Sequence, residues 1–120
     1  TVIETIPLGG AYAYHMAITQ DGKTGFVANQ QSDNISVLDL ASTPRKEKAL
    51  FPTCSAPISM ALSPDQSKLL VVCQRSGNIA VFDPKTLIHL GDISSGGGYP
   101  TSVAIDRNGE YAYVTNSSSK

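Results

Sequence analysis

An internal repeat is the feature that most limits how this chain can fold. A stretch of about 25 residues occurs twice, a shortened third copy follows, and the copies align without a gap at a spacing of about 43–44 residues. The copies read HMAITQDGKTGFVANQQSDNISVLD from His15, SMALSPDQSKLLVVCQRSGNIAVFD from Ser59 and SVAIDRNGEYAYVTNSSSK from Ser102. A period of this length indicates an array of similar structural units.

Each copy breaks into short runs of alternating apolar and polar residues. Such runs predict β-strands, and the turn residues between them predict tight hairpins, because Asp-Gly and Asn-Gly accept the positive φ that these turns require. No helical period is visible. Four strands in about 43 residues describe an antiparallel meander, and meanders arranged radially form a β-propeller. We therefore predict an all-β fold of β-propeller repeats, with about 2.8 four-stranded antiparallel blades.

The repeat also sets the expected division of the chain into a partial propeller. Residues 1–10 are predicted to be the outer strand of a preceding blade, residues 11–55 and 56–98 two blades, and residues 99–120 the first half of a further blade. Propellers close with roughly 4–8 blades, so we expect a fragment of a larger propeller of about seven blades. The alternative is a short subunit that completes its ring by self-association.

The first strand of each copy predicts how neighbouring blades pack. Ile58, Met60 and Leu62 are expected on one face of the strand, and Ser59 and Ala61 on the other. An alanine occupies the centre of the second face in every copy. Small residues there would let neighbouring sheets converge near the axis of a radial array.

Charge and cysteine content exclude several classes of protein. The formal net charge of −1 provides no basic surface for nucleic acid or an anionic membrane. No apolar run approaches the ~20 residues that span a bilayer. Cys54 and Cys73 make no C-x-x-C pair. We expect both thiols to be free, because Cys54 follows the last strand of one blade and Cys73 ends the second strand of the next. The two places are expected to lie farther apart than the ~7 Å Cα limit for a disulfide.

The sequence AYVTN at 112–116, preceded by NGEY, resembles the repeat of the YVTN β-propellers. GFVANQQSDNISVLDL and LLVVCQRSGNIAVFD resemble weaker copies of it, so the resemblance covers nearly the whole chain. It implies a propeller fold. Such repeats are similar to those of lactonase-like enzymes, surface-layer proteins and haem- or quinone-associated propellers, so the resemblance leaves the activity open. We expect no cofactor, and no C-x-x-C-H haem-attachment sequence is present.

His15 is the candidate catalytic residue if the protein is lactonase-like. It occupies a position that is serine in both other copies. Lactonase-like propellers, which this arrangement resembles, often carry a Pro-His pair at the entrance to the innermost strand, with the histidine facing the central channel. Such a histidine could act as a general base or hydrogen-bond donor. This chain lacks the proline beside it, and the alternative is a surface or interblade histidine bonded to a backbone carbonyl.

Tyr14, Arg75 and Asp106 are the candidate ligand-binding residues. Tyr14 adjoins His15, Arg75 could reach an anion from a turn, and Asp106 replaces the threonine or serine of the other copies. The alternatives are a solvated arginine and an aspartate that caps its turn. No metal site is predicted.

These observations favour a binding or scaffold propeller that presents loops and a central channel to a protein or small-molecule ligand. The alternative is a lactonase-like hydrolase with its site at the channel, so the sequence leaves open whether the protein is an enzyme. We expect no nucleic-acid partner and a secreted, periplasmic or cell-surface location. The expected structural partner is the rest of the propeller, or further copies of the chain.

Overall fold

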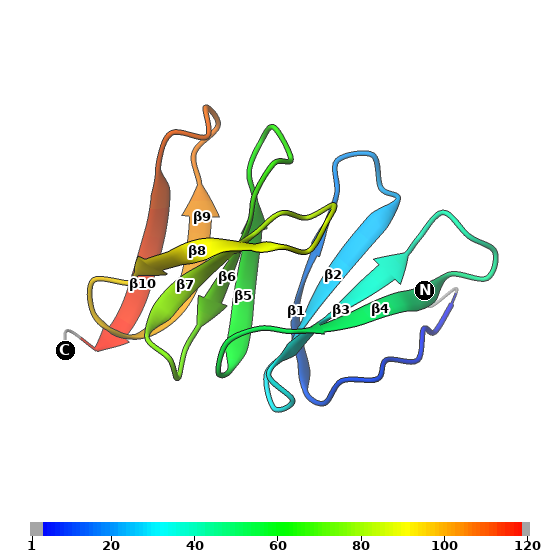
Figure 1. Ribbon diagram of the computed structural model, residues 1–120, viewed down its shortest axis with the longest axis horizontal. Helices are drawn as coiled ribbons and strands as arrows, with labels where there is room; N and C mark the ends of the chain where they lie inside the picture. Colours follow the sequence, from blue (N-terminus) through cyan, green and yellow to red (C-terminus); the bar gives the residue numbers. More distant parts are fainter. Residues whose placement is uncertain (1–3, 119–120) are drawn as a thin grey trace.

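The computed structural model describes residues 4–118, which form ten strands and no helix. The strands make three antiparallel sheets that lie side by side in chain order (Figure 1). The first sheet contains β1 (Ala13–Ile18), β2 (Thr24–Asn29), β3 (Asn34–Asp39) and β4 (Lys46–Pro52). The second contains β5 (Pro57–Leu62), β6 (Leu69–Cys73), β7 (Asn78–Phe82) and β8 (His89–Ser94), and the third pairs β9 (Gly98–Ile105) with β10 (Ala112–Ser118).

Both four-stranded sheets are meanders in which each strand pairs with the next. The turn between the first two strands of each sheet contains one residue with positive φ, namely Gly22, Gln66 and Gly109 in turn. Glycine adopts this conformation without steric cost, which explains the Asp-Gly and Asn-Gly sequences. The prediction of an all-β fold built from propeller blades is confirmed.

The first strands of the sheets bring neighbouring blades together. β5 contacts both β1 and β9, so the three first strands are adjacent although they are far apart in the sequence. This is the arrangement of innermost strands in a propeller, where each blade packs its face against the next. We refer to the three sheets as blades 1, 2 and 3.

Two apolar cores fill the spaces between the blades. The first lies between blades 1 and 2 and includes Phe26 and Val37 from one side and Leu69 and Val71 from the other. The second lies between blades 2 and 3 and includes Leu70, Val72, Ile79, Val81 and Val103. Blade 2 is therefore buried on both faces, as alternate side chains of its central strands point into different cores.

The outer faces of blades 1 and 3 lack a covering blade in this chain. Met16 shows the consequence, because its side chain is 42% exposed whereas Met60, at the same position of blade 2, is 4% exposed under blade 1. On blade 3, Tyr111 and Tyr113 are exposed as well. Large apolar side chains exposed on a sheet face agree with a face that packs against another structure.

A β-bulge corrects the expected faces of the first strand. The pairing of β5 with β6 shifts between Pro57 and Ser59, so Ile58 is an extra residue in the strand. Ile58 therefore joins the core shared with blade 3, while Met60 and Leu62 join the core shared with blade 1. The expectation that Ile58 shares a face with Met60 was wrong, because strict alternation does not survive a bulge.

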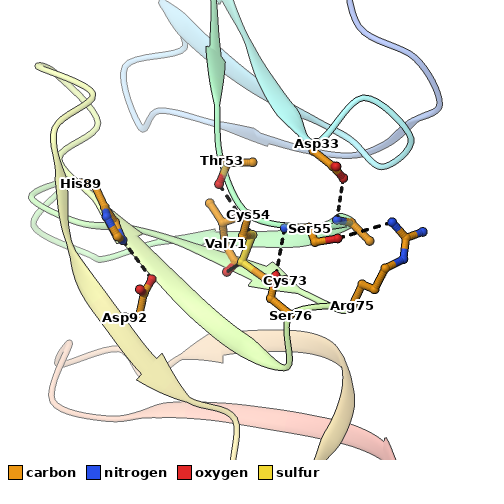
Figure 2. Close-up of a disulfide and its surroundings, with 11 residues drawn as sticks. Asp33, Thr53, Cys54, Ser55, Val71, Cys73, Arg75, Ser76, His89 and Asp92 are labelled. Carbon is orange, nitrogen blue, oxygen red and sulfur yellow. Dashed lines mark hydrogen bonds and ion pairs between the residues drawn. A yellow bond between two sulfur atoms is a disulfide. The ribbon is translucent and has the colours of Figure 1, made fainter.

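The expectation of two free thiols was also wrong. Cys54 and Cys73 form a disulfide, with their Cα atoms 5.5 Å apart (Figure 2). Cys54 does follow the last strand of blade 1, but the chain then returns to the innermost strand of blade 2. Because the first residue of β5, Pro57, pairs with Cys73 at the end of β6, this connection passes directly beside Cys73.

The disulfide occupies a place that the other two blades fill differently. The positions equivalent to Cys54 and Cys73 are Gly10 and Asn29 in blade 1, and Gly97 and Asn116 in blade 3. A Cβ atom on Gly10 would overlap the Asn29 side chain, and one on Gly97 would lie 3.0 Å from Cγ of Asn116. The glycines thus make room for an asparagine that is buried in blade 1 and partly buried in blade 3, and blade 2 has a covalent bond in place of this close approach.

The N-terminal segment lies along blade 1 without joining its sheet. The Glu4 carboxylate accepts hydrogen bonds from the backbone and the guanidinium of Arg45, the latter at 2.8 Å, and Gly9 N–H donates to the Glu47 carboxylate. Residues 4–8 are not in a strand. Residues 1–3 lie outside the described range, so the assignment of 1–10 to the outer strand of another blade stays a prediction.

Candidate functional site

The end of the blades at which β1, β5 and β9 begin is here called the entrance end. Where each first strand begins, one residue at the same position of the repeat has a positive φ: Tyr12 just before β1, Ala56 just before β5 and Tyr99 at the second position of β9, with φ between 51° and 59°. This conformation is unfavourable for residues other than glycine, and such strain often accompanies function. Tyr12 and Tyr99 are exposed, whereas Ala56 is buried. The sequence reasoning missed these tyrosines, although their equivalent places in the repeat were visible.

His15 lies on β1, one residue after the bulge of that strand, and is exposed. Its Nδ1 atom accepts a hydrogen bond of 3.2 Å from the backbone N–H of Met60 in blade 2. The side chain therefore bridges two innermost strands, which agrees with an interblade position, but its partner is an N–H group and not a carbonyl. Serine at this position in the other copies is too short to make the same bridge.

Tyr14 is the extra residue of the β1 bulge, since the pairing shifts between Ala13 and His15. The same shift occurs at Ile58, and between Ser102 and Pro100 in blade 3, so the bulge recurs in each blade. Bulges redirect side chains and are frequent beside functional sites. Tyr14 and His15 both border a shallow hollow of about 430 Å³ on the outer face of blade 1.

Arg75 lies in the turn between β6 and β7, also at the entrance end. Its backbone N–H donates to Ser55 O at 3.3 Å, and its Nη1 donates to Ser55 Oγ at 3.4 Å (Figure 2). Ser55 N–H in turn donates to Ser76 Oγ, and Ala56 N–H donates to the Asp33 carboxylate of blade 1 at 2.8 Å. These bonds hold the linker between blades 1 and 2 and leave the guanidinium exposed.

Asp106 lies at the opposite end of the blades, after the last residue of β9. Its Oδ1 atom accepts hydrogen bonds from the backbone N–H groups of Glu110, at 2.8 Å, and Tyr111, at 3.2 Å. The carboxylate therefore caps the β9–β10 turn. The structure does not bring Asp106 together with His15, and a role in ligand binding stays a prediction.

Two aspartates perform the same capping in the other blades. Asp65 accepts hydrogen bonds from the Ser67 and Ser63 hydroxyls and from Ser67 N–H, which lowers the pKa of its carboxyl to about 2. The Thr19 hydroxyl and Lys23 N–H likewise lower the pKa of Asp21. Hydrogen bonds to the ionised form stabilise that form. Both carboxylates are thus structural acceptors rather than proton donors.

The described residues contain no gathering of three histidine, cysteine or acidic side chains suited to a metal ion. Within residues 4–118 there is also no helix long and apolar enough to cross a membrane. The exposed groups at the entrance end include the imidazole of His15, the phenols of Tyr12, Tyr14 and Tyr99, and the guanidinium of Arg75.

The sequence pattern of one protein family matches this chain over residues 16–86, which is more than half of its length. That family is "Lactonase, 7-bladed beta-propeller". The chain belongs to this family. Its resemblance to the YVTN propellers in particular stays a prediction.

Solved structures with the same fold include quite different proteins. Hydrazine synthase of Kuenenia stuttgartiensis has a TM-score of 0.81 at 23% identity over 97% of this chain, and a candidate 6-phosphogluconolactonase of Bacteroides fragilis has 0.79 at 22% over 89%. The WD40 repeats of RRP9 have 0.77 at 20% over 88%. At these identities the likeness shows the fold alone.

The chain spans about a third of the length of these solved structures, with 32% of each covered. It also matches the Groucho protein of Drosophila melanogaster at 41% identity over 73 residues, which is 60% of this chain and 10% of that protein. The family has seven-bladed propellers, whereas the described residues form two complete blades and half of a third. This difference agrees with the prediction of a partial propeller.

Proposed function

We propose that this protein is a binding propeller whose ligand is held at the entrance end, with His15 as a hydrogen-bond donor. The observation that carries the proposal is the bond from Met60 N–H to Nδ1 of His15. A neutral imidazole has one acceptor nitrogen and one donor nitrogen. Because Nδ1 is engaged as the acceptor, Nε2 carries the hydrogen and is the atom available to a ligand.

This arrangement favours binding over general-base catalysis. A general base needs a free lone pair within reach of the proton that it removes. In His15 that lone pair already accepts from Met60 N–H, so proton uptake at Nδ1 would break the bridge between β1 and β5. Tyr14 and the strained Tyr12 add exposed phenol groups to the same end, which suits a ligand with hydroxyl or carboxylate oxygens.

A lactonase-like hydrolase is the second candidate, and membership of a family named for lactonases favours it. In that case His15 would act in catalysis, and the remaining catalytic groups would come from other blades. The two candidates predict different effects of one substitution, since a donor contributes to affinity and a general acid or base contributes to turnover.

The experiment uses full-length protein, wild type and His15→Ser, with 6-phosphogluconolactone for turnover and 6-phosphogluconate for binding by calorimetry. The binding proposal predicts a several-fold weaker affinity for 6-phosphogluconate and a rate of lactone hydrolysis within about twofold of wild type. His89→Ser, on the exposed outer strand β8, is the matched control and should change neither. A fall in turnover of about 10²–10⁴-fold would establish the hydrolase instead. Unchanged affinity and turnover would remove His15 from the site.

We also propose that further blades of the same polypeptide complete the ring. The exposed faces of blades 1 and 3 and the seven-bladed family support this, while self-association of the chain is the alternative. The proposed location is secreted, periplasmic or cell-surface. The disulfide supports it, because disulfides persist in oxidising compartments.

A further inference from the structure

A groove lies between blades 1 and 2 at the end opposite to His15. It has a volume of about 760 Å³, within the usual range for small-molecule sites, and both of its walls belong to the described chain. One wall comes from the β1–β2 turn and the strands β3 and β4. The other comes from the β5–β6 and β7–β8 turns. The groove is thus formed by two complete blades.

Lys48 lines this groove because of a second β-bulge. The pairing of β3 with β4 shifts between Val37 and Leu38, which pair with Ala49 and Glu47, so Lys48 is an extra residue in the strand. In blade 2 the same shift occurs, and the extra residue there is Leu90. The bulge therefore recurs in both complete blades, whereas a lysine at the extra position occurs only in blade 1 of these two.

Lys85 provides a second cation from the β7–β8 turn of blade 2. Its backbone is fixed, because its N–H donates to the Asp83 carboxylate at 2.8 Å and the preceding Pro84 is buried. Within residues 4–118 neither the Lys48 nor the Lys85 ammonium takes part in an ion pair. Hydrogen bonds from the backbone N–H groups of Lys85 and Thr86 lower the pKa of the nearby Asp83 carboxyl, and the Lys85 charge adds to this effect. Lys48 and Lys85 are both exposed, so a ligand can reach them.

The other residues that line the groove are of two kinds, an apolar group here called the floor and a polar group here called the rim. Val37, Ala49 and Leu87 form the floor. At the rim, the Asp21 carboxylate already accepts from the Thr19 hydroxyl at 2.6 Å and from Lys23 N–H at 3.0 Å. Gln66 closes the inner side, since its Oε1 accepts from Gln20 N–H of blade 1 at 3.0 Å and its Nε2 donates within its own turn.

We propose that this groove binds a small oxyanion, a carboxylate or a phosphate, carried on a compact apolar body. The oxyanion lies between the ammonium groups of Lys48 and Lys85, and the apolar body covers the floor. Two cations face one carboxylate that is engaged in its own turn, so the groove favours an anion. The site is separate from the entrance end and does not depend on the role of His15.

The test titrates full-length protein with phenyl phosphate and with benzoate, which distinguish the two oxyanions, and with phenol, which lacks the charge. Binding is measured by calorimetry. We expect at least one of the two anions to bind, phenol to bind at least about tenfold more weakly, and Lys48→Leu or Lys85→Ala to weaken anion binding by at least about fivefold. Lys48→Leu installs the residue that blade 2 has at this position, so the fold is expected to remain.

Two controls make the test specific. Lys46→Leu removes a lysine from the same strand that does not line the groove, and Lys48→Arg keeps the charge, so both variants should bind within about twofold of wild type. Loss of affinity in Lys46→Leu equal to that in Lys48→Leu would overturn the proposal, because it would indicate attraction by overall charge. Absence of binding by both anions, or phenol binding as well as they do, would overturn it too. His15→Ser should leave anion binding in the groove unchanged. The groove proposal and the proposed function of His15 can therefore fail independently of each other.

Discussion

Replacing Cys54 and Cys73 together by serine is expected to lower the free energy of unfolding of the full-length protein by about 3 kcal/mol. The disulfide closes a loop with a sequence separation of 19 residues, and a loop of that size accounts for about this stabilisation through the restricted unfolded chain. The change is measured by urea denaturation of the double variant beside the oxidised wild type.

The repeat supplies a matched control for this substitution. Cys54→Gly with Cys73→Asn introduces the pair found in blades 1 and 3. In blade 1, Asn29 Nδ2 donates to Asn34 Oδ1 at 3.0 Å, whereas the equivalent Asn78 Oδ1 of blade 2 is buried and without a partner within residues 4–118. The Gly/Asn variant should therefore regain about 1 kcal/mol relative to the serine variant. Two titratable thiols in the unreduced wild type, or a serine variant as stable as wild type, would contradict the account.

Phe26→Ala is expected to destabilise the full-length protein by about 3–5 kcal/mol. The Phe26 side chain is fully buried in the core between blades 1 and 2, so its removal leaves a cavity bordered by both blades. Chemical denaturation followed by circular dichroism measures the loss.

Phe26→Leu is the control, because blade 2 has Leu70 at this position. A leucine fills most of the space, and the expected cost is below about 1.5 kcal/mol. If Phe26→Ala were as mild as Phe26→Leu, the blades would not pack through this core and the proposed interblade contact would be wrong.

The fold could be predicted from the sequence because each blade repeats the same local signals. Alternation defines the strands, and Asp21-Gly22 and Asn108-Gly109 mark two of the turns. The β-bulges could not be predicted in this way. An extra residue such as Ile58 still fits the alternation of apolar and polar residues with Ser59 and Met60, and only the pairing of β5 with β6 reveals it.

The disulfide was missed for a related reason. The repeat pattern gives the position of a residue within its own blade, but it does not give the path of the linker between blades. Cys54 and Cys73 meet where the linker from blade 1 crosses the end of β6. The signal was nevertheless in the sequence, because both cysteines replace members of a recurring Gly and Asn pair. A paired deviation from the repeat at two positions indicates a contact between them.

The candidate site was predictable only in part. Comparison of the copies placed His15 correctly on an innermost strand, but its bond to Met60 depends on the next blade and has no sequence signature. The same comparison selected Asp106, which the structure places in a turn at the other end of the blades. Lys48 was not selected, because its position in the groove depends on a bulge.

Methionine oxidation tests most directly the claim that this chain is part of a closed ring of blades. Met16 and Met60 occupy the same position in blades 1 and 2, and Met60 is covered by blade 1 whereas Met16 is exposed in this chain. Full-length protein is treated with hydrogen peroxide, and sulfoxide formation at each residue is followed by mass spectrometry. If the ring is closed, a further blade covers Met16. In the folded protein Met16 and Met60 should then both oxidise slowly, at rates within a few-fold of each other. In urea, where both side chains are exposed, the two residues should oxidise at the same, faster rate. Oxidation of Met16 in the folded protein at the rate seen in urea, with Met60 still protected, would contradict the ring.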